Sequence, residues 1–421
     1  MGMDKDLDLN SSVYNWAISF FFIGYVILQV PGSTVIAKFS PRWVLPSLAV
    51  MWGTIVCLMP VVRDYKEFWA LRFILGLTQS CFYPGIIFLF GSWYTKEELG
   101  KRIMLFGAGN ELSGAVGGIT AGAISDIMEG VAGLSAWKWL FIIEGMLAVI
   151  LGLVGYFLLP NFYHNTDWLT SEERQLAKSR IEKQGVQVVS TTYSWRSMAN
   201  TLTTPYLWLM VVNVTLIGLT QNLPRNFAII LRDLGFPVAF CNYMLTPVYI
   251  FAALAAIFVG WSSDYHNGER AFHIAGVQFW IGTWYMILAA VNRGNNPVVL
   301  VFIGAYAISI NMSMGTFCMA WLNEFYKQDN NTRAFVIAFV NSVRQITSSL
   351  VNVKAWVVSD SPAFWLGKVT SMGAAYASVT ITVLIWFLYR IGFRLPEATN
   401  KAINEEEEPA SAATEETTIR I

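Results

Sequence analysis

The sequence predicts an all-α polytopic membrane protein with two helical bundles. Of its 421 residues, 55% are hydrophobic and 13% are charged, whereas soluble proteins carry about 25% charged residues. The apolar residues form long runs without the alternation of barrel strands, and only helices and closed barrels satisfy their backbone in lipid. One charged segment divides the runs into two groups. We therefore expect two bundles embedded in a bilayer.

Each membrane span is predicted from an apolar run near the length of about 20 residues that a helix needs to cross a bilayer. The first group forms an N-terminal bundle of five spans within residues 1–160, and the second forms a six-helix bundle within 206–395. In chain order the predicted spans are 12–37, 43–62, 67–93, 102–127, 137–160, 206–233, 238–261, 271–291, 297–325, 332–356 and 370–394.

The charged segment between the bundles, residues 161–205, is predicted to be a central loop. Within it, Thr170 or Ser171 is placed to cap a helix whose first turn holds Glu172 and Glu173. Oxygen-bearing side chains at the cap and acids in the first turn are typical of a helix N-terminus. The loop should therefore contain an amphipathic helix.

Residues 396–421 are predicted to be a disordered acidic tail, because this stretch is too polar to pack a core. Lys and Arg are more numerous in the loops that share one side of the membrane with the central loop and the C-terminus. Because basic residues remain in cytoplasmic loops, we expect this side to be cytoplasmic. We expect the chain to lie in the plasma membrane.

Charge and metal-binding residues exclude several classes of protein. The 28 basic and 28 acidic residues balance, which gives no electrostatic reason to expect a nucleic-acid partner. The cysteines and histidines are scattered without the spacing of a disulfide framework or a metal site: Cys57, Cys81, Cys241, Cys318, His164, His266 and His273. We predict no metal or other cofactor. No nucleophile motif, acid pair or histidine cluster indicates an enzyme.

A loop in the second bundle contains Gly260, Asp264 and Arg270, which resembles the glycine–acid–arginine loop of the major facilitator superfamily. The resemblance implies that the glycine permits a close approach of helices. It also implies that the acid and the arginine latch the cytoplasmic ends of the helices, a structural or gating role.

Further motifs resemble the fungal allantoate permease family of anion:cation symporters within that superfamily. They are Phe22-Ile23-Gly24-Tyr25 with Lys38-Phe39-Ser40-Pro41, Arg72-Phe73 with Gly76, Phe82-Tyr83-Pro84-Gly85, Trp93-Tyr94 with Lys96-Glu97-Glu98, and Trp137 to Gly145. Members of that family import small organic acids and vitamins such as allantoate, nicotinate, pantothenate and biotin. Since they have twelve helices and residues 2–7 resemble the loop after the first one, we expect that first helix to be missing here.

Polar residues deep in a span are candidates to line a transport cavity, because they are costly in lipid. In the span 67–93, Arg72, Gly76, Gln79 and Tyr83 share one helix face. Gln79 and Tyr83 are candidate substrate contacts. Arg72 could contact substrate, or it could have a structural role in an ion pair or by extending its head group to the membrane surface.

Glu111 and Glu144 are candidates for proton coupling. Glu111 precedes a ridge of small residues, Gly114, Gly118 and Gly122, that should let two helices approach closely. Burial at such a contact favours the neutral carboxyl group, although Glu111 could instead be the constant partner of a buried cation. Glu144 could also be structural, as the ion-pair partner of Arg72.

In the second bundle, Arg344 lies near mid-span on a polar stripe, where a guanidinium group could bind a carboxylate through two hydrogen bonds. Pairing with a buried acid is the alternative. The other candidate substrate contacts are Asn341 on the same stripe and the mid-span amides Asn213, Gln221 and Asn311, which could instead join helices. Pro224 and Arg225 are expected at the broken outer end of their span.

The resemblance implies that the protein is a monomeric secondary transporter. It would carry a small organic anion with a proton by alternating access of the two bundles. Two alternatives stay open from the sequence. One is an exporter of a fungal metabolite, and the other is a non-transporting sensor or an inactive truncated member of the family.

Overall fold

The computed structural model describes residues 3–7, 11–166, 168–182, 195–291, 297–326, 330–357 and 360–391. The described residues form helices and connecting loops, with no strand among them. The predicted tail, 396–421, lies outside the described residues, as does the part of the central loop from 183 to 194.

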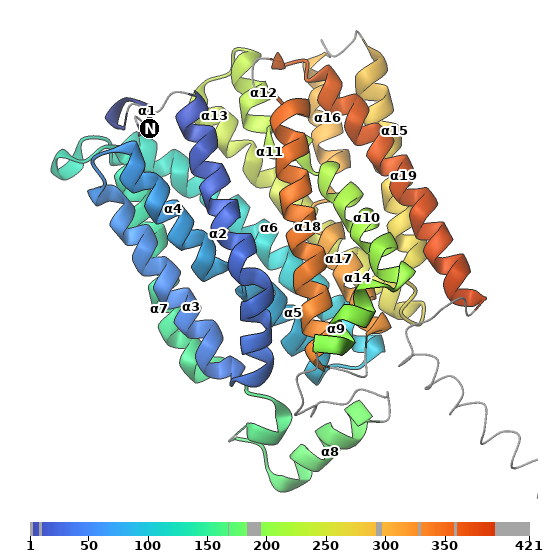
Figure 1. Ribbon diagram of the computed structural model, residues 1–421. Coiled ribbons are helices and arrows are strands. Elements are labelled where there is room, and N and C mark those ends of the chain that lie inside the picture. The colour runs from blue at the N-terminus through green and yellow to red at the C-terminus, as the bar shows by residue number, and fades with distance from the viewer. Residues whose placement is uncertain are drawn as a thin grey trace, which may run out of the picture.

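The first bundle contains the helices before the central loop (Figure 1). They are α1 (Met3–Asp6), α2 (Ser11–Lys38), α3 (Pro41–Leu58), η1 (Met59–Val61), α4 (Tyr65–Gln79), α5 (Phe82–Trp93), α6 (Lys96–Ile127), η2 (Val131–Gly133) and α7 (Ala136–Leu158). The central segment then forms η3 (Tyr163–Asn165), α8 (Ser171–Glu182) and α9 (Trp195–Leu202).

The second bundle follows the central segment and lies beside the first (Figure 1). Its helices are α10 (Pro205–Leu219), α11 (Asn222–Arg225), α12 (Phe227–Asp233), α13 (Val238–Tyr243), α14 (Leu245–Tyr265), α15 (Ala271–Ala290), α16 (Val298–Ser309), α17 (Met314–Phe325), α18 (Asn330–Ala355) and α19 (Trp365–Arg390). Helices α1 and α8 lie at opposite ends of the molecule. We call these the α1 end and the α8 end.

Helices occupy all the predicted spans, although not all of them are equally apolar. Among the described residues, eight helical stretches are long and apolar enough to cross a membrane. The predicted spans in α2, α6 and α15 fall outside that set. Helix α6 is less apolar because glycine and polar residues alternate with its hydrophobic ones, and this helix packs against the other bundle. Its polar positions therefore need not face lipid.

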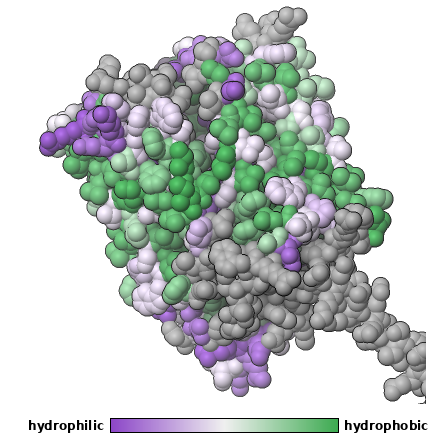
Figure 2. Space-filling view, in the orientation of Figure 1, coloured by the Kyte–Doolittle hydropathy of each residue, from purple (hydrophilic) through white to green (hydrophobic). Residues whose placement is uncertain are grey.

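The outer surface carries large apolar side chains where lipid would surround it. Helix α7 exposes many of them, and the exposed fractions of Phe157 and Leu158 reach 78% and 72%. Figure 2 shows hydrophobic residues gathered over the middle of the visible face and hydrophilic ones mainly toward both ends. An apolar surface this extensive suits a bilayer rather than water, which agrees with a multi-pass membrane protein.

The two bundles pack against each other through the predicted ridge of small residues on α6. A Cβ atom on Gly114 would lie 3.0 Å from the Tyr249 ring, and one on Gly118 would lie 3.1 Å from the carbonyl oxygen of Asn242. At Gly122 the neighbour is the Tyr243 ring, at 2.8 Å. The predicted close approach is confirmed, and its partners are α13 and α14 of the other bundle.

Four predicted spans are interrupted rather than continuous. The span 67–93 breaks between α4 and α5, 206–233 breaks on both sides of α11, 238–261 breaks between α13 and α14, and 297–325 breaks between α16 and α17. Irregular backbone at membrane depth is tolerated where protein or a cavity surrounds it. These breaks reorient the side chains that follow them, which decides which residues reach the space between the bundles.

The central segment contains the capped helix that the sequence predicts. The Oγ1 atom of Thr170 accepts a hydrogen bond of 3.2 Å from the backbone N–H of Glu173, and Oε2 of Glu173 accepts one of 2.9 Å from the backbone N–H of Thr170. This reciprocal pair is a capping box. The bond from the Thr170 backbone holds the pKa of the Glu173 carboxyl below its ordinary value. Thr170 is therefore the cap of α8.

Candidate functional site

A cavity of about 960 Å³ lies between the two bundles. Helices α2 to α6 line it from the first bundle, and α11, α14, α17 and α18 line it from the second. Its volume is at the upper end of the range of about 300–1,000 Å³ for small-molecule sites. Most of its wall is aromatic, amide or glycine.

Three residues with ionisable acid or base groups stand out in this wall: Glu111, Arg225 and Arg344. Among the described residues none of the three forms an ion pair. Charged groups in a low-dielectric site normally have a counterion. The cavity therefore presents two guanidinium groups and one carboxyl group that are available to a ligand.

Glu111 is positioned by the α6 helix and its glycine ridge. Its side chain is 3% exposed. The Ser313 hydroxyl donates a 3.3 Å hydrogen bond to Oε1 of Glu111, and the Asn110 amide donates one of 3.4 Å to the same atom. Neutral partners of this kind accommodate both the protonated and the ionised carboxyl group. The sequence left open that Glu111 is the constant partner of a buried cation. Among the described residues, no cationic side chain lies within ion-pair distance of Glu111.

Arg344 extends from α18 into the cavity. Its Nη2 donates a 3.3 Å hydrogen bond to Oδ1 of Asn341, while its buried Nε has no partner. Gly315 on α17 leaves room for the guanidinium group, since a Cβ atom there would lie 3.2 Å from Nη1 of Arg344. Most of the five N–H donors of this guanidinium group therefore have no acceptor among the described residues.

Arg225 also faces the cavity, at the end of the short helix α11. Its Nη2 donates a 2.9 Å hydrogen bond to Oε1 of Gln221. The Gln221 amide in turn donates to the carbonyl oxygens of Asn311 and Met312, at 3.2 and 2.9 Å. The sequence placed Arg225 at an outer helix end. The breaks on both sides of α11 instead direct it inward, and only the Pro224-Arg225 break signal hinted at this.

Tyrosine and aromatic rings complete the wall around these groups. The Tyr83 hydroxyl donates a 3.1 Å hydrogen bond to Oγ1 of Thr316 across the two bundles, and the Asn341 amide donates one of 3.5 Å to the Tyr25 hydroxyl. Tyr249 contributes a third phenol, and Trp52 and Phe82 contribute rings. The wall can thus contact the carbon skeleton of a ligand and hydrogen-bond to its oxygens.

Of the substrate contacts proposed from the sequence, five line the cavity: Gln79, Tyr83, Gln221, Asn341 and Arg344. Asn213 and Asn311 lie outside its lining. Asn213 accepts a 2.6 Å hydrogen bond from Ser378 and donates one of 3.0 Å to Thr382, both on α19. Asn311 donates one of 2.6 Å to Thr220. These two amides join helices within the second bundle, the alternative that the sequence left open.

Arg72 and Glu144 do not form the expected ion pair. The guanidinium carbon of Arg72 lies 5.0 and 5.9 Å from the rings of Phe68 and Phe141. Glu144 has no hydrogen bond or ion pair among the described residues, and neither residue lines the cavity. Gly76 packs against Phe21 of α2. The four residues predicted to share one helix face in the span 67–93 therefore do not all line the cavity. Helix α4 ends at Gln79, and Tyr83 belongs to the next helix, α5.

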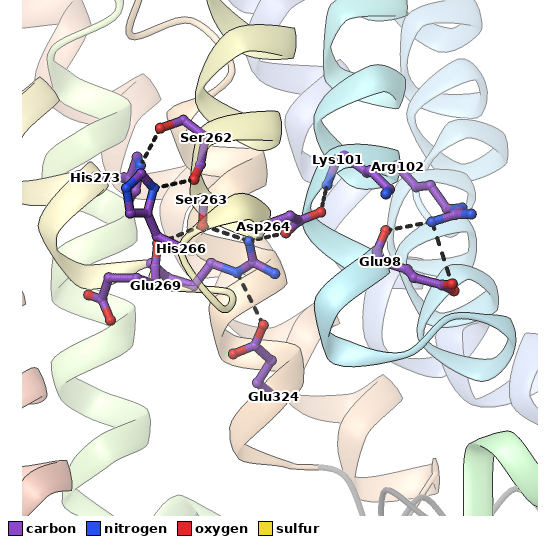
Figure 3. A network of polar contacts seen from close by, with 11 residues as sticks. Glu98, Lys101, Arg102, Ser262, Ser263, Asp264, His266, Glu269, His273 and Glu324 are labelled. Carbon is purple, nitrogen blue, oxygen red and sulfur yellow. Dashed lines mark hydrogen bonds and ion pairs between the residues drawn. The ribbon is translucent and has the colours of Figure 1, made fainter.

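The α8 end of the molecule is held by a network of polar contacts that includes Asp264, Glu324 and Lys101 (Figure 3). Arg270 joins the two acids. Nη1 of Arg270 lies 2.7 Å from Oδ1 of Asp264, and its Nε lies 3.1 Å from Oε1 of Glu324. Oδ2 of Asp264 accepts a 2.7 Å hydrogen bond from the backbone N–H of Lys101 in the other bundle. Both charged side chains of the first pair are almost completely buried, at 0% and 6% exposed.

Other contacts reinforce this junction between the bundles. Gly260 lets α14 approach α6, because a Cβ atom there would lie 2.7 Å from Cβ of Met104. Arg333 on α18 donates a 3.2 Å hydrogen bond to the carbonyl oxygen of Gly91 and one of 3.1 Å to the Ser92 hydroxyl. The α8 end is therefore joined by polar contacts between the bundles, several of them charged.

Comparisons with known proteins agree with this architecture. The sequence profile of the Major Facilitator Superfamily matches residues 1–351. The transporter cnsO of Penicillium expansum is 28% identical over 92% of this chain and 77% of its own length. A protein of Pseudomonas putida assigned by name to metabolite transport, NicT, is 28% identical over 73% of this chain and 70% of its own. A protein of Agrobacterium vitis assigned by name to tartrate transport is 26% identical over 91% and 84%.

Solved structures show the same fold. The proton:xylose symporter XylE matches with a TM-score of 0.68 and 14% identity, covering 95% of this chain and 93% of its own. The human organic anion transporter MFSD10 matches with a TM-score of 0.60 and 13% identity, covering 89% and 82%. With the profile match over most of the sequence, these findings show that the chain belongs to the major facilitator superfamily and is a transporter of that family.

Proposed function

We propose that the protein is a secondary active transporter that carries a small organic anion together with a proton. The observation that carries this proposal is that Glu111 and Arg344 face one cavity between the two bundles, and neither forms an ion pair with another described residue. The carboxyl group would exchange the proton, and the guanidinium group would bind the anion. The proton gradient would be the energy source.

The anionic substrate is supported by the state of Arg344. A guanidinium group with unused donors binds a carboxylate through two parallel hydrogen bonds. The relative assigned to tartrate transport handles a carboxylate. The motifs shared with the allantoate permease family support the same class of substrate, which includes vitamin-like carboxylates such as nicotinate, pantothenate and biotin.

Proton coupling is supported by the surroundings of Glu111. Its hydrogen-bond partners Asn110 and Ser313 are neutral. The charged or titratable groups that interact with it electrostatically are Arg225 and Tyr249, both from the second bundle. A carboxyl group with this environment can change protonation without losing a fixed ion pair. Its charge interacts electrostatically with Arg225 and Tyr249 on the other side of the cavity.

Alternating access would follow from movement of one bundle against the other around the cavity. The network around Arg270 would hold the α8 end together while the cavity is accessible from the α1 end. We place the α8 end and the C-terminus in the cytoplasm, and the protein in the plasma membrane as a monomer.

The proposal is tested by uptake of radiolabelled carboxylic acids into cells that lack their own carriers. Uptake should rise as the external pH falls. In Glu111→Gln, which keeps the size and hydrogen-bonding capacity of the side chain, the pH dependence should disappear because the neutral amide cannot exchange a proton. Glu129→Gln, outside the cavity, is the matched control and should retain the dependence.

Two results would contradict the proposal. If uptake by the wild type did not vary with pH, protons would not be the coupled ion. If Glu111→Gln kept the same pH dependence as the wild type, the coupling group would lie elsewhere. Loading the cells with the labelled acid and following its release under the opposite gradient measures the direction of transport.

A further inference from the structure

We infer that the cavity is built for a dianion, with Arg225 as a second carboxylate site beside Arg344. This inference rests on the proposed transport of an organic anion and narrows its substrate to molecules with two carboxylate groups. The proposal depends on where Arg225 lies, what surrounds it and how the charges of the wall balance.

Arg225 and Arg344 approach the same part of the cavity from two helices, α11 and α18. Gln221 lies between them. Its Oε1 accepts the 2.9 Å hydrogen bond from Arg225. A Cβ atom on Gly315 would lie 3.8 Å from Nε2 of Gln221 and 3.2 Å from Nη1 of Arg344, so these two nitrogen atoms lie around the same position. The two guanidinium groups are therefore near neighbours with one neutral amide between them.

This pair of like charges has no counterion in the part of the chain that the structure describes. The two guanidinium groups are close enough to interact electrostatically. Each makes one side-chain hydrogen bond, Arg225 to Gln221 and Arg344 to Asn341, and neither forms an ion pair among the described residues. Arg225 is exposed to the cavity and Arg344 is half-buried, and like charges held close together repel each other. Two carboxylates on one ligand would relieve this repulsion.

Glu111 does not fill the role of counterion. It interacts with Arg225 electrostatically, but no ion pair within 4.0 Å joins them. When Glu111 carries a proton, the acidic and basic side chains of the wall leave two positive charges and no negative one. A dianion neutralises both charges, whereas a monoanion leaves one guanidinium group uncompensated.

Discrimination should therefore be strong. A site whose polar groups are arranged to pair with a ligand binds an analogue without the matching group more weakly, because those polar groups stay unpaired. A hydrogen bond to a charged group contributes about 1.5–3 kcal/mol, which corresponds to roughly 10- to 100-fold in affinity. The predicted preference is for the dicarboxylate over an analogue of the same shape with one neutral end.

The experiment measures binding to the purified full-length protein in lipid nanodiscs, at a pH where both carboxylates of the probe are ionised. The probes are tartrate and succinate, each compared with its own monoamide, in which one carboxylate is replaced by a neutral amide. Fluorescence of Trp52, which lines the cavity, and calorimetry report binding. We expect at least one dicarboxylate to bind about tenfold or more tightly than its monoamide.

Variants of the two arginines test which of them binds each carboxylate of the ligand. Arg225→Gln should weaken binding of the dicarboxylate to the level of the monoamide and leave the monoamide affinity unchanged. Arg344→Gln should weaken both. Arg225→Lys, which keeps the charge, should retain part of the preference. The control is Arg232→Gln on α12, an exposed arginine paired with Asp233 outside the cavity, which should bind like the wild type.

Failure of this inference is distinct from failure of the proposed function. Equal affinity of the wild type for a dicarboxylate and its monoamide would overturn the dianion site and leave organic-anion transport standing. So would an Arg225→Gln variant that folds normally, as judged by its thermal unfolding, and weakens both probes alike. If neither dicarboxylate nor either monoamide bound to the wild type, the dianion site would likewise be overturned, and the uptake experiment would decide the proposed transport of carboxylates independently.

Discussion

At the scale of single residues, Asp6 shows how one carboxylate ties a terminal segment to the bundle. Its Oδ2 accepts a 2.6 Å hydrogen bond from the Ser135 hydroxyl and one of 2.8 Å from the indole N–H of Trp137. These bonds lower the pKa of the Asp6 carboxyl from its ordinary value of 3.8. They favour the ionised carboxylate, so the tie depends on pH.

The sign of that dependence follows from the lowered pKa. A carboxyl group whose pKa is lower in the folded protein stabilises it fully above the pKa of the unfolded chain, and this contribution is lost as the pH falls through the folded value. We expect the attachment of α1 to loosen below pH of about 4. Asp6→Asn should show weaker attachment at neutral pH and no such acid transition. Amide hydrogen exchange of residues 3–7 measures both effects, and an acid transition unchanged in Asp6→Asn would contradict this assignment.

The cost of placing a charged side chain in lipid explains which cavity residues could be predicted from the sequence. Glu111 and Arg344 were recognisable because a charged side chain in the middle of an apolar run is costly unless it faces protein or a cavity. The same reasoning does not separate a cavity wall from a helix contact. Asn213 and Asn311 illustrate this, since their amides hydrogen-bond to neighbouring helices. Their orientation depends on how α10 and the α16–α17 connection are rotated.

At the scale of elements, the packing of α6 against α13 and α14 rests on glycine. Gly118 faces a backbone carbonyl oxygen, which cannot move away as a flexible side chain can, whereas nothing lies within 4 Å of a Cβ atom on Gly117. These two adjacent glycines offer a matched comparison. One is required by the contact between bundles, and the other is open.

We predict that Gly118→Val destabilises the protein by about 1–3 kcal/mol, the usual effect of overpacking, because the added methyl groups would separate α6 from α13. Gly117→Val should change stability by less than about 0.5 kcal/mol. Thermal unfolding in the same detergent measures both variants. Equal destabilisation by the two substitutions would mean that helix propensity, and not the contact between bundles, determines the result.

The positions of the helix breaks could not be predicted from the sequence, although the positions of the helices could. The apolar runs located a helix at every predicted span, because length and hydropathy are properties of a segment alone, and eight helical stretches among the described residues are long and apolar enough to cross a membrane. The breaks around α11 depend on tertiary contacts, such as the hydrogen bonds from Gln221 to the carbonyl oxygens of Asn311 and Met312. These contacts come from a distant part of the chain, so periodicity in 206–233 could not reveal that Arg225 faces inward.

At the scale of the whole molecule, the network around Arg270 should control how easily the bundles separate at the α8 end. Arg270 holds Asp264 and Glu324, and Asp264 reaches the backbone of the other bundle. Removing one partner from a buried ion pair leaves an uncompensated charge and costs about 3–5 kcal/mol. Because these three side chains all belong to the second bundle, the substitution acts on the junction through Asp264, whose carboxylate accepts the hydrogen bond from the Lys101 backbone of the first bundle.

Arg270→Gln should therefore shift the population toward molecules in which the α8 ends of the bundles are apart. Spin labels on the exposed residues Phe39 and Tyr265, in a Cys57→Ser background, report this as a longer mean distance. His266→Gln, on the exposed side of the same loop, should leave the distance distribution as in the wild type. If Arg270→Gln left it unchanged too, the network would be structural rather than part of the gate.

One contact in this network joins a side chain to the main chain, and this has an evolutionary consequence. Asp264 is bound by the backbone N–H of residue 101 and not by the lysine side chain. Every amino acid except proline supplies that N–H group. Among natural relatives that keep this junction, position 101 should consequently drift freely with proline excluded, while position 264 should stay acidic. The junction uses the peptide group of residue 101 rather than its side chain, so a substitution there that keeps the N–H group should leave the hydrogen bond to Asp264 in place.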